Sequence, residues 1–462
     1  MHLRSTFEPV IRFANTVRAW FLAHTVKDTG IVLFIIMLAV LLRVPFLSHP
    51  NQTLFDEVLH ANFAINIIAG APFFDIHPPL ARMLFAEVAS FFPFEVSTIP
   101  IAINQSFQDF PYVALRFFVA LFGILLVPLV YALARTLGYI PRIAMIPALF
   151  VVFDNALVFY SRTMLPDTIL LVCVFSGFLA AFAATKKTAG WKRYALVITA
   201  ALALGLAVSI KWTALGVVGV VFIAYLLAKM YREIFISGII VAIVYTAIFT
   251  VFLFSFPGGG KTDPVLKTYD VPIVTELEFP GEHRPGSIAS FFFAHHRVML
   301  ETNRDPEITK GITSAPGPLA WPPARSVIAV WKNSEGNKFI ILTGNSLLWI
   351  VTFFALIFEL IWIAAHYFRD RRFPIDRNES ILLLGYLMNY LPFFLIHRPM
   401  FLYHYFTSLI FLFLLFPRIA PRIVNCIARV SGDRMLALTL AAFVGLLILV
   451  NFILLAPSTY GF

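Results

Sequence analysis

Long apolar stretches separated by short basic segments are the dominant pattern of this chain. A helix needs roughly 20 apolar residues to cross the hydrocarbon core of a bilayer. The pattern predicts eleven membrane spans, near residues 29–47, 113–134, 142–159, 166–184, 194–210, 212–228, 235–256, 340–364, 380–396, 400–417 and 435–455.

Two of the apolar stretches are too long for one crossing. As a single helix, residues 194–228 would measure roughly 52 Å, against a core of roughly 30 Å. Lys211 and Trp212 lie at the middle of this stretch, which predicts a hairpin with Lys211 at its apex. The stretch 380–417 divides in the same way at His397-Arg398-Pro399.

The composition agrees with a membrane protein that crosses the bilayer many times. Hydrophobic residues make up 60% of the 462 positions and charged residues only 13%, whereas soluble domains have about half apolar and a quarter charged residues. We therefore predict an all-α polytopic protein, with residues 1–462 forming a single transmembrane domain. The first apolar run is long, begins well inside the chain and has no small-residue cleavage site, so it is expected to remain as a span.

The positions of the basic residues set the orientation. Cytoplasmic loops of membrane proteins collect Lys and Arg. With eleven spans and a cytoplasmic N-terminus, all the basic clusters fall on one face: Arg4, Arg12, Arg18, Lys27, Arg135, Arg142, Lys186, Lys187, Lys192, Arg193, Lys229, Arg232, Arg369, Arg371, Arg372, Arg377, Arg418, Arg422, Arg429 and Arg434. The net charge of +10 is thus explained by topology and does not indicate a nucleic-acid partner.

Cys173 and Cys426 have no metal-ligand spacing and give no disulfide framework.

Two outer loops are large. The first, about 48–112, contains two apolar stretches, 58–69 and 79–92, which we expect to be helices lying in the membrane interface. The second, about 257–339, is rich in Pro and charged residues and is a candidate lid.

The polar residues that could carry chemistry gather at the predicted outer ends of the spans. They are Asp56, Glu57, His77, Arg116, Asp154, Arg162, Asp167, Lys211, His397, Arg398, Tyr403 and His404. Ionisable groups in or near a bilayer are costly and usually have a function. A carboxylate could take a proton from an acceptor, and Arg or Lys could neutralise a phosphate, so the set suggests an anionic lipid-linked substrate.

Several segments, in one order along the chain, resemble the protein O-mannosyltransferases, a family of the GT-C class of lipid-carrier-dependent membrane glycosyltransferases. The matching segments are Phe55-Asp56-Glu57, Asp75-Ile76-His77-Pro78-Pro79-Leu80, 115–123, 155–158, Ser161-Arg162 with Asp167, 205–212, Trp321-Pro322, Gly344-Asn345 and 397–405. The resemblance implies a GT-C-like bundle of about eleven transmembrane helices. Eukaryotic members carry a large soluble insert in the loop before the eighth span. The corresponding loop here has only about 80 residues, which is typical of a prokaryotic member or of a divergent relative.

The resemblance also implies an activity. The family transfers mannose from a polyprenyl-phosphate carrier to Ser or Thr hydroxyls of proteins crossing the membrane, with inversion at the anomeric carbon. Asp56 matches the catalytic acidic position, and Glu57 is its neighbour. The expected partners are the lipid-linked donor, a secreted or membrane protein acceptor and the bilayer. Members often work as dimers, which leaves a dimer open here. No metal or other cofactor is expected, and the expected location is the plasma membrane of a prokaryote with an extracytoplasmic active site.

Structural interpretations of the same residues stay open. Asp56 and Glu57 could cap an interfacial helix, and His77 could be held by the prolines that follow it. Arg116, Arg162 and Lys211 could snorkel at span ends, although we expect two of the three to hold carrier phosphate. Asp167 could be an N-cap or pair with Arg162. The set His397, Arg398, Tyr403 and His404 could belong to an interfacial belt or bind the carrier.

Two other functions are consistent with parts of the pattern. The first is sugar transfer to a lipid acceptor, as in aminoarabinose transferases, which would need a lateral apolar groove with cations. The second is transport of a lipid-linked sugar. Transporters place ionisable groups near the midplane and carry repeats, whereas the charges here gather at one face and no repeat is visible.

Overall fold

The computed structural model describes residues 28–71, 73–96, 101–255, 285–304, 317–325, 327–396 and 400–462. Almost all of this part of the chain is helical. The helices after an initial helical segment at 28–43 are α2 (Glu57–Ala69), α3 (Leu80–Ser90), α4 (Tyr112–Thr136), α5 (Pro141–Val152), α6 (Asn155–Tyr160), α7 (Asp167–Thr185), α8 (Trp191–Val208), α9 (Leu215–Leu227), α10 (Tyr231–Ser255), α12 (Pro285–Arg304), α13 (Ser346–Asp370), α14 (Arg377–Tyr390), α15 (Phe406–Ser431) and α16 (Arg434–Tyr460). Short 3-10 turns are η1 (Trp212–Ala214), η4 (Pro318–Ala320), η5 (Leu391–Leu395) and η6 (Leu402–Tyr405).

The predicted fold class is confirmed. Every predicted span overlaps a helix, and seven helices of the described residues are long and apolar enough to cross a membrane: α4, α7, α8, α10, α13, α15 with η6, and α16. The predicted break at Lys211 is present, because α8 ends at Val208 and η1 begins at Trp212. The turn predicted at residues 397–399 lies outside the described residues.

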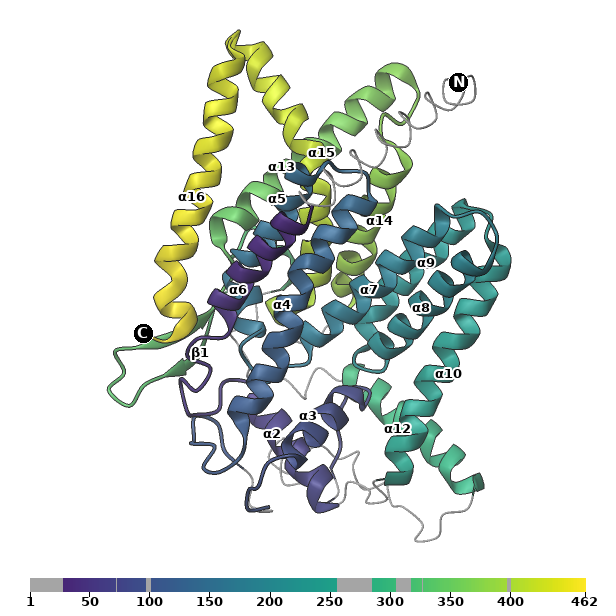
Figure 1. The fold of residues 1–462 in the computed structure, drawn as a ribbon, viewed down its shortest axis with the longest axis vertical. Coiled ribbons are helices and arrows are strands. Elements are labelled where there is room, and N and C mark those ends of the chain that lie inside the picture. Colours follow the sequence, from purple (N-terminus) through teal and green to yellow (C-terminus); the bar gives the residue numbers. More distant parts are fainter. Residues whose placement is uncertain are drawn as a thin grey trace, which may run out of the picture.

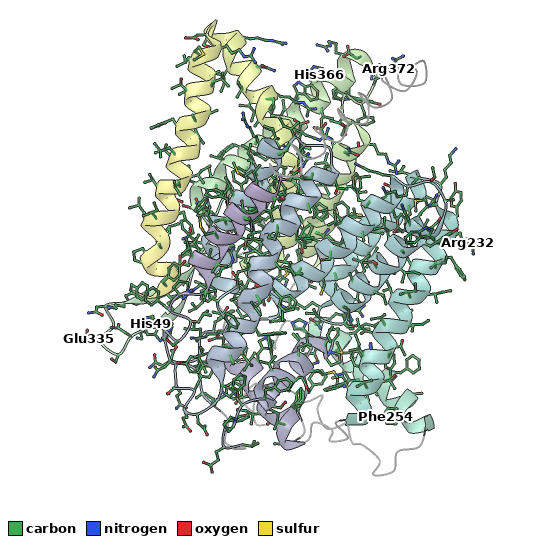
Figure 2. The ribbon with its side chains drawn as sticks, in the orientation of Figure 1. His49, Arg232, Phe254, Glu335, His366 and Arg372 are labelled. Carbon is green, nitrogen blue, oxygen red and sulfur yellow. The ribbon has the colours of Figure 1, made fainter. Side chains whose placement is uncertain are left out.

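Most of the helices form one bundle, and α2, α3 and α12 lie at one end of it. Figure 1 shows α2, α3 and α12 below the long helices, and α16 standing along one side. Within the bundle α7 packs against α4 and α8, and α14 packs against α9 and α15. The labelled Arg372 and Phe254 lie at opposite ends of the molecule (Figure 2).

Two predicted spans have different boundaries in the structure. The span predicted at 142–159 is broken after Val152, because the Asp154 side chain accepts a hydrogen bond from Leu157 N (2.9 Å) and begins the new helix α6. The same carboxylate accepts from Asn345 N at the start of α13 (3.3 Å) and from Trp349. Asp154 therefore joins two helix ends inside the bundle.

The second difference is an antiparallel hairpin that the hydrophobic pattern did not reveal. Strand β1 (Ile328–Lys332) pairs with β2 (Phe339–Leu342), with a bulge between Ala329 and Trp331. The span predicted at 340–364 therefore begins later, at Ser346, where the side chain of Asn345 caps α13 by accepting from Leu348 N (3.2 Å).

The two helices expected in the first outer loop are present as α2 and α3, and they pack against each other. The backbone of Phe55 has a φ of 44°, a left-handed conformation that is unusual for a bulky side chain. This turn brings Asp56 and Glu57 to the start of α2.

Candidate active site

The two adjacent carboxylates at the start of α2 have different surroundings. Glu57 is fully buried, and each of its oxygens accepts two hydrogen bonds. Oε1 accepts from Arg116 Nε (2.9 Å) and Met164 N (2.8 Å), and Oε2 accepts from Arg116 Nη2 (2.7 Å) and Leu54 N (3.1 Å). Glu57 is therefore engaged entirely by the protein.

Arg116 on α4 is equally engaged. Besides its two bonds to Glu57, it donates to three backbone carbonyls of the preceding loop: Leu47 O (3.1 Å), Pro50 O (2.7 Å) and Gln52 O (3.2 Å). A guanidinium has five N–H donors, so all five are used. The rings of Phe107 and Tyr112 cover its faces. In this arrangement Arg116 holds the loop before Asp56 and has no donor left for a phosphate.

Asp56 differs from its neighbour because no described residue makes a hydrogen bond or ion pair to its carboxylate. The side chain is half-buried, and this burial raises its pKa to about 7. The nearby ammonium of Lys211 acts in the opposite direction, whereas the carboxylates of Asp167 and Asp75 raise the pKa further. A pKa near neutrality suits a general base.

Asp167 and Lys211 form the buried ion pair of this region. Lys211 Nζ lies 2.8 Å from Oδ1 and 2.9 Å from Oδ2 of Asp167, and 4.6 Å from the centre of the Tyr403 ring. Asp167 was expected either to cap a helix or to pair with Arg162. It does neither, because its carboxylate is bound by Lys211. Asp167 at the start of α7 thus pairs with Lys211 in the break between α8 and η1, and both charges act electrostatically on Asp56.

Arg162 faces away from this cluster. Its guanidinium donates to Arg43 O (3.0 Å), Pro45 O (2.6 Å) and Phe46 O (3.1 Å), and stacks on Tyr460. We expected two of the cations Arg116, Arg162 and Lys211 to hold phosphate. Both arginines instead bind backbone carbonyls, and of the three only Lys211 lines the cavity described below. Neither arginine could be distinguished from Lys211 by sequence, because all three are cations at span ends.

A second buried pair holds the Asp75-Ile76-His77 turn. Arg82 Nη1 lies 2.8 Å from Asp75 Oδ2, Arg82 Nη2 donates to His77 O (2.5 Å), and His77 N donates to Asp75 Oδ1 (3.1 Å). Three aromatic rings, those of Phe63, Phe73 and Phe252, surround the guanidinium. Arg82 was missed by the sequence reasoning. The available signal was a single arginine within the predicted interfacial helix at 79–92.

A cavity of about 400 Å³ is lined in part by Lys211. Its polar lining consists of His77, Lys211, Trp212, Thr213, Asn303, Arg304, Asn389 and His404. Its apolar lining consists of Leu215, Gly216, Leu300, Met388, Pro392, Phe393 and Ile396. A smaller recess that shares Lys211 and His404 also contacts Asp167 and Tyr403. The structure thus brings His77, Asp167, Lys211, Tyr403 and His404 together, while His397 and Arg398 lie outside the described residues.

Tyr403 and His404 are positioned by stacking. Their rings lie 4.4 Å apart, and the His404 ring stacks on Trp321 with centroids 6.1 Å apart.

Asn303, Arg304 and Asn389 also line the cavity but were not expected from sequence, because the helices that carry them have no motif around these positions. Among the described residues, no cluster of three or more His, Cys, Asp or Glu has the geometry of a metal site.

The fold defines the class of protein. The structure matches a chain of the Saccharomyces cerevisiae protein O-mannosyltransferase Pmt1-Pmt2 complex bound to the sugar donor, with a TM-score of 0.76 over 94% of this chain and 90% of that chain, at 19% identity. It also matches the archaeal oligosaccharyltransferase AglB of Archaeoglobus fulgidus, with a TM-score of 0.54 over 96% of this chain and 56% of that one, at 15% identity. This is the GT-C fold of membrane glycosyltransferases.

Two family models together match most of the sequence. Residues 33–260 match the dolichyl-phosphate-mannose-protein mannosyltransferase model, and residues 288–462 match the C-terminal four-transmembrane region of protein O-mannosyltransferase. The chain belongs to the protein O-mannosyltransferase family, as the sequence motifs predicted.

Curated relatives match over part of their length. Dolichyl-phosphate-mannose–protein mannosyltransferase 1 of Candida albicans is 36% identical over 200 residues, which are 42% of this chain and 22% of that protein. Dolichyl-phosphate-mannose–protein mannosyltransferase 5 of Saccharomyces cerevisiae is 27% identical over 268 residues, which are 56% of this chain and 36% of that protein. The matched segments thus cover about a third or less of these relatives.

Proposed function

We propose that this protein is an inverting mannosyltransferase, which moves mannose from a polyprenyl-phosphate carrier to Ser or Thr hydroxyls of proteins. The observation that carries the proposal is the difference between Asp56 and Glu57. Glu57 is fully hydrogen-bonded, whereas the Asp56 carboxylate has no partner among the described residues and a pKa of about 7. Asp56 lies within the electrostatic reach of Lys211, which lines a cavity with both cationic and apolar side chains. The family and the fold support mannose as the sugar and a lipid phosphate as the carrier.

In the proposed reaction Asp56 is the general base. Its carboxylate takes the proton of the acceptor hydroxyl, and the hydroxyl oxygen forms a bond to the anomeric carbon as the bond from that carbon to the phosphate oxygen breaks. The electron pair of the broken bond leaves with the phosphate. A single displacement of this kind inverts the anomeric centre and needs one base on the acceptor side.

The cations would stabilise the departing phosphate. The negative charge on the carrier increases as the phosphodiester becomes a phosphomonoester, so a cation held at that point favours the transition state over the ground state. Lys211 is fixed in place by Asp167 at 2.8 Å and can serve this role without reorganisation. The apolar part of the cavity would accept the first isoprene units. We propose no metal or other cofactor in this step.

The remaining parts of the proposal concern location and assembly. We propose a prokaryotic plasma membrane, with the N-terminus in the cytoplasm and the site on the extracytoplasmic side. Its support is the distribution of basic residues and the short second outer loop. The matched Saccharomyces chain comes from a complex of Pmt1 with Pmt2, and a dimer is the corresponding proposal here.

The test is transfer in detergent from labelled polyprenyl-phosphate mannose to a Ser/Thr-rich peptide, with the anomeric configuration of the product determined by NMR. The proposal expects mannosyl-peptide of inverted configuration. Folded protein that leaves the peptide unmodified but labels an added lipid acceptor would contradict it in favour of lipid modification. A retained configuration would exclude the single displacement.

A further inference from the structure

The C-terminal end of α12 is attached to the turn that carries His77. Asn303 Nδ2 donates to Ile76 O (3.1 Å) and also to Met299 O within its own helix (2.8 Å). Arg304 follows directly and lines the cavity beside Lys211. The last turn of α12 therefore forms part of the cavity wall.

A second connection holds α12 to another residue of the cavity lining, Trp212. His296 of α12 is bonded to the Tyr245 hydroxyl of α10 (2.7 Å), which also accepts from Trp212 Nε1 (3.0 Å). Trp212 itself lines the cavity. Since α12 is tied both to the His77 turn and to Trp212, its end is positioned relative to the cavity by two independent contacts.

The charges of the cavity are unbalanced. Among the described residues its lining includes two cations, Lys211 and Arg304, and no carboxylate. The charge of Lys211 is already matched by Asp167 at 2.8 Å. Arg304 is exposed and makes no ion pair or hydrogen bond through its side chain to any described residue. Its guanidinium therefore has free donors in a cavity that is lined by both polar and apolar side chains.

We propose that Arg304 is a phosphate-binding residue that contacts the polyprenyl phosphate from α12, in the same cavity as Lys211. This inference rests on the proposed function and deepens it, since it concerns the headgroup of the same carrier. A guanidinium binds phosphate oxygens with two parallel hydrogen bonds, whereas an ammonium acts as a point charge. Arg304 thus supplies the geometry that Lys211 lacks.

The charge of the ligand makes the inference specific. The sugar-bearing donor is a phosphodiester with one negative charge, whereas the released carrier is a phosphomonoester that carries up to two. Arg304 therefore binds the released carrier more strongly than the donor and stabilises the charge that develops during transfer. Its loss should weaken binding of polyprenyl phosphate more than binding of polyprenyl-phosphate mannose.

The experiment measures binding of sugar-free polyprenyl phosphate to the purified full chain in detergent, by native mass spectrometry or calorimetry. The variants are Arg304→Gln and Arg304→Lys. Arg297→Gln is the matched control, because Arg297 lies on the same helix, is exposed and pairs with Glu301 at 2.8 Å. A charge-assisted bidentate contact predicts about tenfold to hundredfold weaker binding for Arg304→Gln. Arg304→Lys should recover part of the loss, and Arg297→Gln should bind as the wild type does.

Equal binding by folded Arg304→Gln and wild type would overturn the role of Arg304 and leave the proposed function standing. An equal loss in the Arg297 control would also overturn it, because the effect would then be one of overall charge. Wild-type protein that binds no polyprenyl phosphate would overturn the proposed function itself.

Discussion

Glu57 and Arg116 form a bidentate ion pair in the interior, with Oε1 2.9 Å from Nε and Oε2 2.7 Å from Nη2. Neither side chain has appreciable contact with solvent. The pair connects the start of α2 to α4, and the remaining hydrogen bonds of Arg116 reach the loop between the first helix and Asp56. Its consequence is that the carboxylate next to Glu57, that of Asp56, is held in place while remaining free to react.

The ion pair predicts a structural defect for Arg116→Gln. Removing one partner of a buried pair leaves the other charge uncompensated, which typically costs about 3–5 kcal/mol of stability. Thermal unfolding in detergent should show a markedly lower transition temperature. Arg142→Gln is the control, since Arg142 is an exposed arginine in the first turn of α5. An unchanged transition with weaker donor binding would mean instead that Arg116 contacts phosphate.

The pKa of Asp56 predicts the pH dependence of transfer. A general base acts in its deprotonated form, and burial raises the pKa of Asp56 from 3.8 to about 7. The rate at low donor concentration should therefore rise about tenfold per pH unit below that value and level off above it. The measurement is kcat/KM between pH 5.5 and 8.5. A profile that is flat across this range would contradict the assignment of Asp56 as the base.

Lys211 and Asp167 should shift that profile in opposite directions. The ammonium of Lys211 lowers the pKa of Asp56 and the carboxylate of Asp167 raises it. Lys211→Gln should therefore move the midpoint to higher pH, and Asp167→Asn should move it to lower pH, each with reduced transfer because the buried pair is broken. The double variant should return the midpoint toward that of the wild type. Shifts in the same direction would refute the electrostatic coupling.

Gly216 is predicted to set the width of the cavity between α9 and α14. A Cβ at this position would lie 2.3 Å from Asn389 Oδ1, so Gly216→Ala must displace a second residue of the cavity wall. The expected result is a higher KM for the donor with a smaller change in kcat. Gly238→Ala on α10 is the matched control, because a Cβ there meets nothing within 4 Å. Identical kinetics for Gly216→Ala and wild type would show that the donor does not use this part of the cavity.

The helical bundle followed from the hydrophobic pattern because each span is long and the bilayer thickness limits its length. The break at Lys211 was predictable for the same reason. The hairpin at 328–342 was not, since the apolar residues of β2 are close to those of α13 and read as one run. The break at Asp154 depends on Asn345 and Trp349, which are almost 200 residues away in sequence.

The sequence allowed the residues of the site to be predicted as a set, but not which of them bind the protein itself and which are available to a substrate. Asp56 and Glu57 are adjacent carboxylates, and they are distinguished mainly by two distant partners of Glu57, Arg116 and Met164 N, which lie 59 and 107 residues away in sequence. Likewise Arg116 and Arg162 resemble Lys211 in sequence, but the loop carbonyls between residues 43 and 52 fold around their guanidinium groups. Such partners are set by tertiary packing and leave no periodic signal in the chain.

The measurement that tests the central claim most directly is mannosyl transfer by Asp56→Asn beside wild type, at matched folding in detergent. Asparagine keeps the shape of the side chain and removes its ability to accept a proton as a carboxylate. If Asp56 is the general base, transfer by Asp56→Asn should be about 10²–10⁴-fold slower than by wild type, whereas the unfolding transition and the binding of polyprenyl phosphate should be preserved. Transfer at the wild-type rate by folded Asp56→Asn would contradict the account, because the base would then be another group.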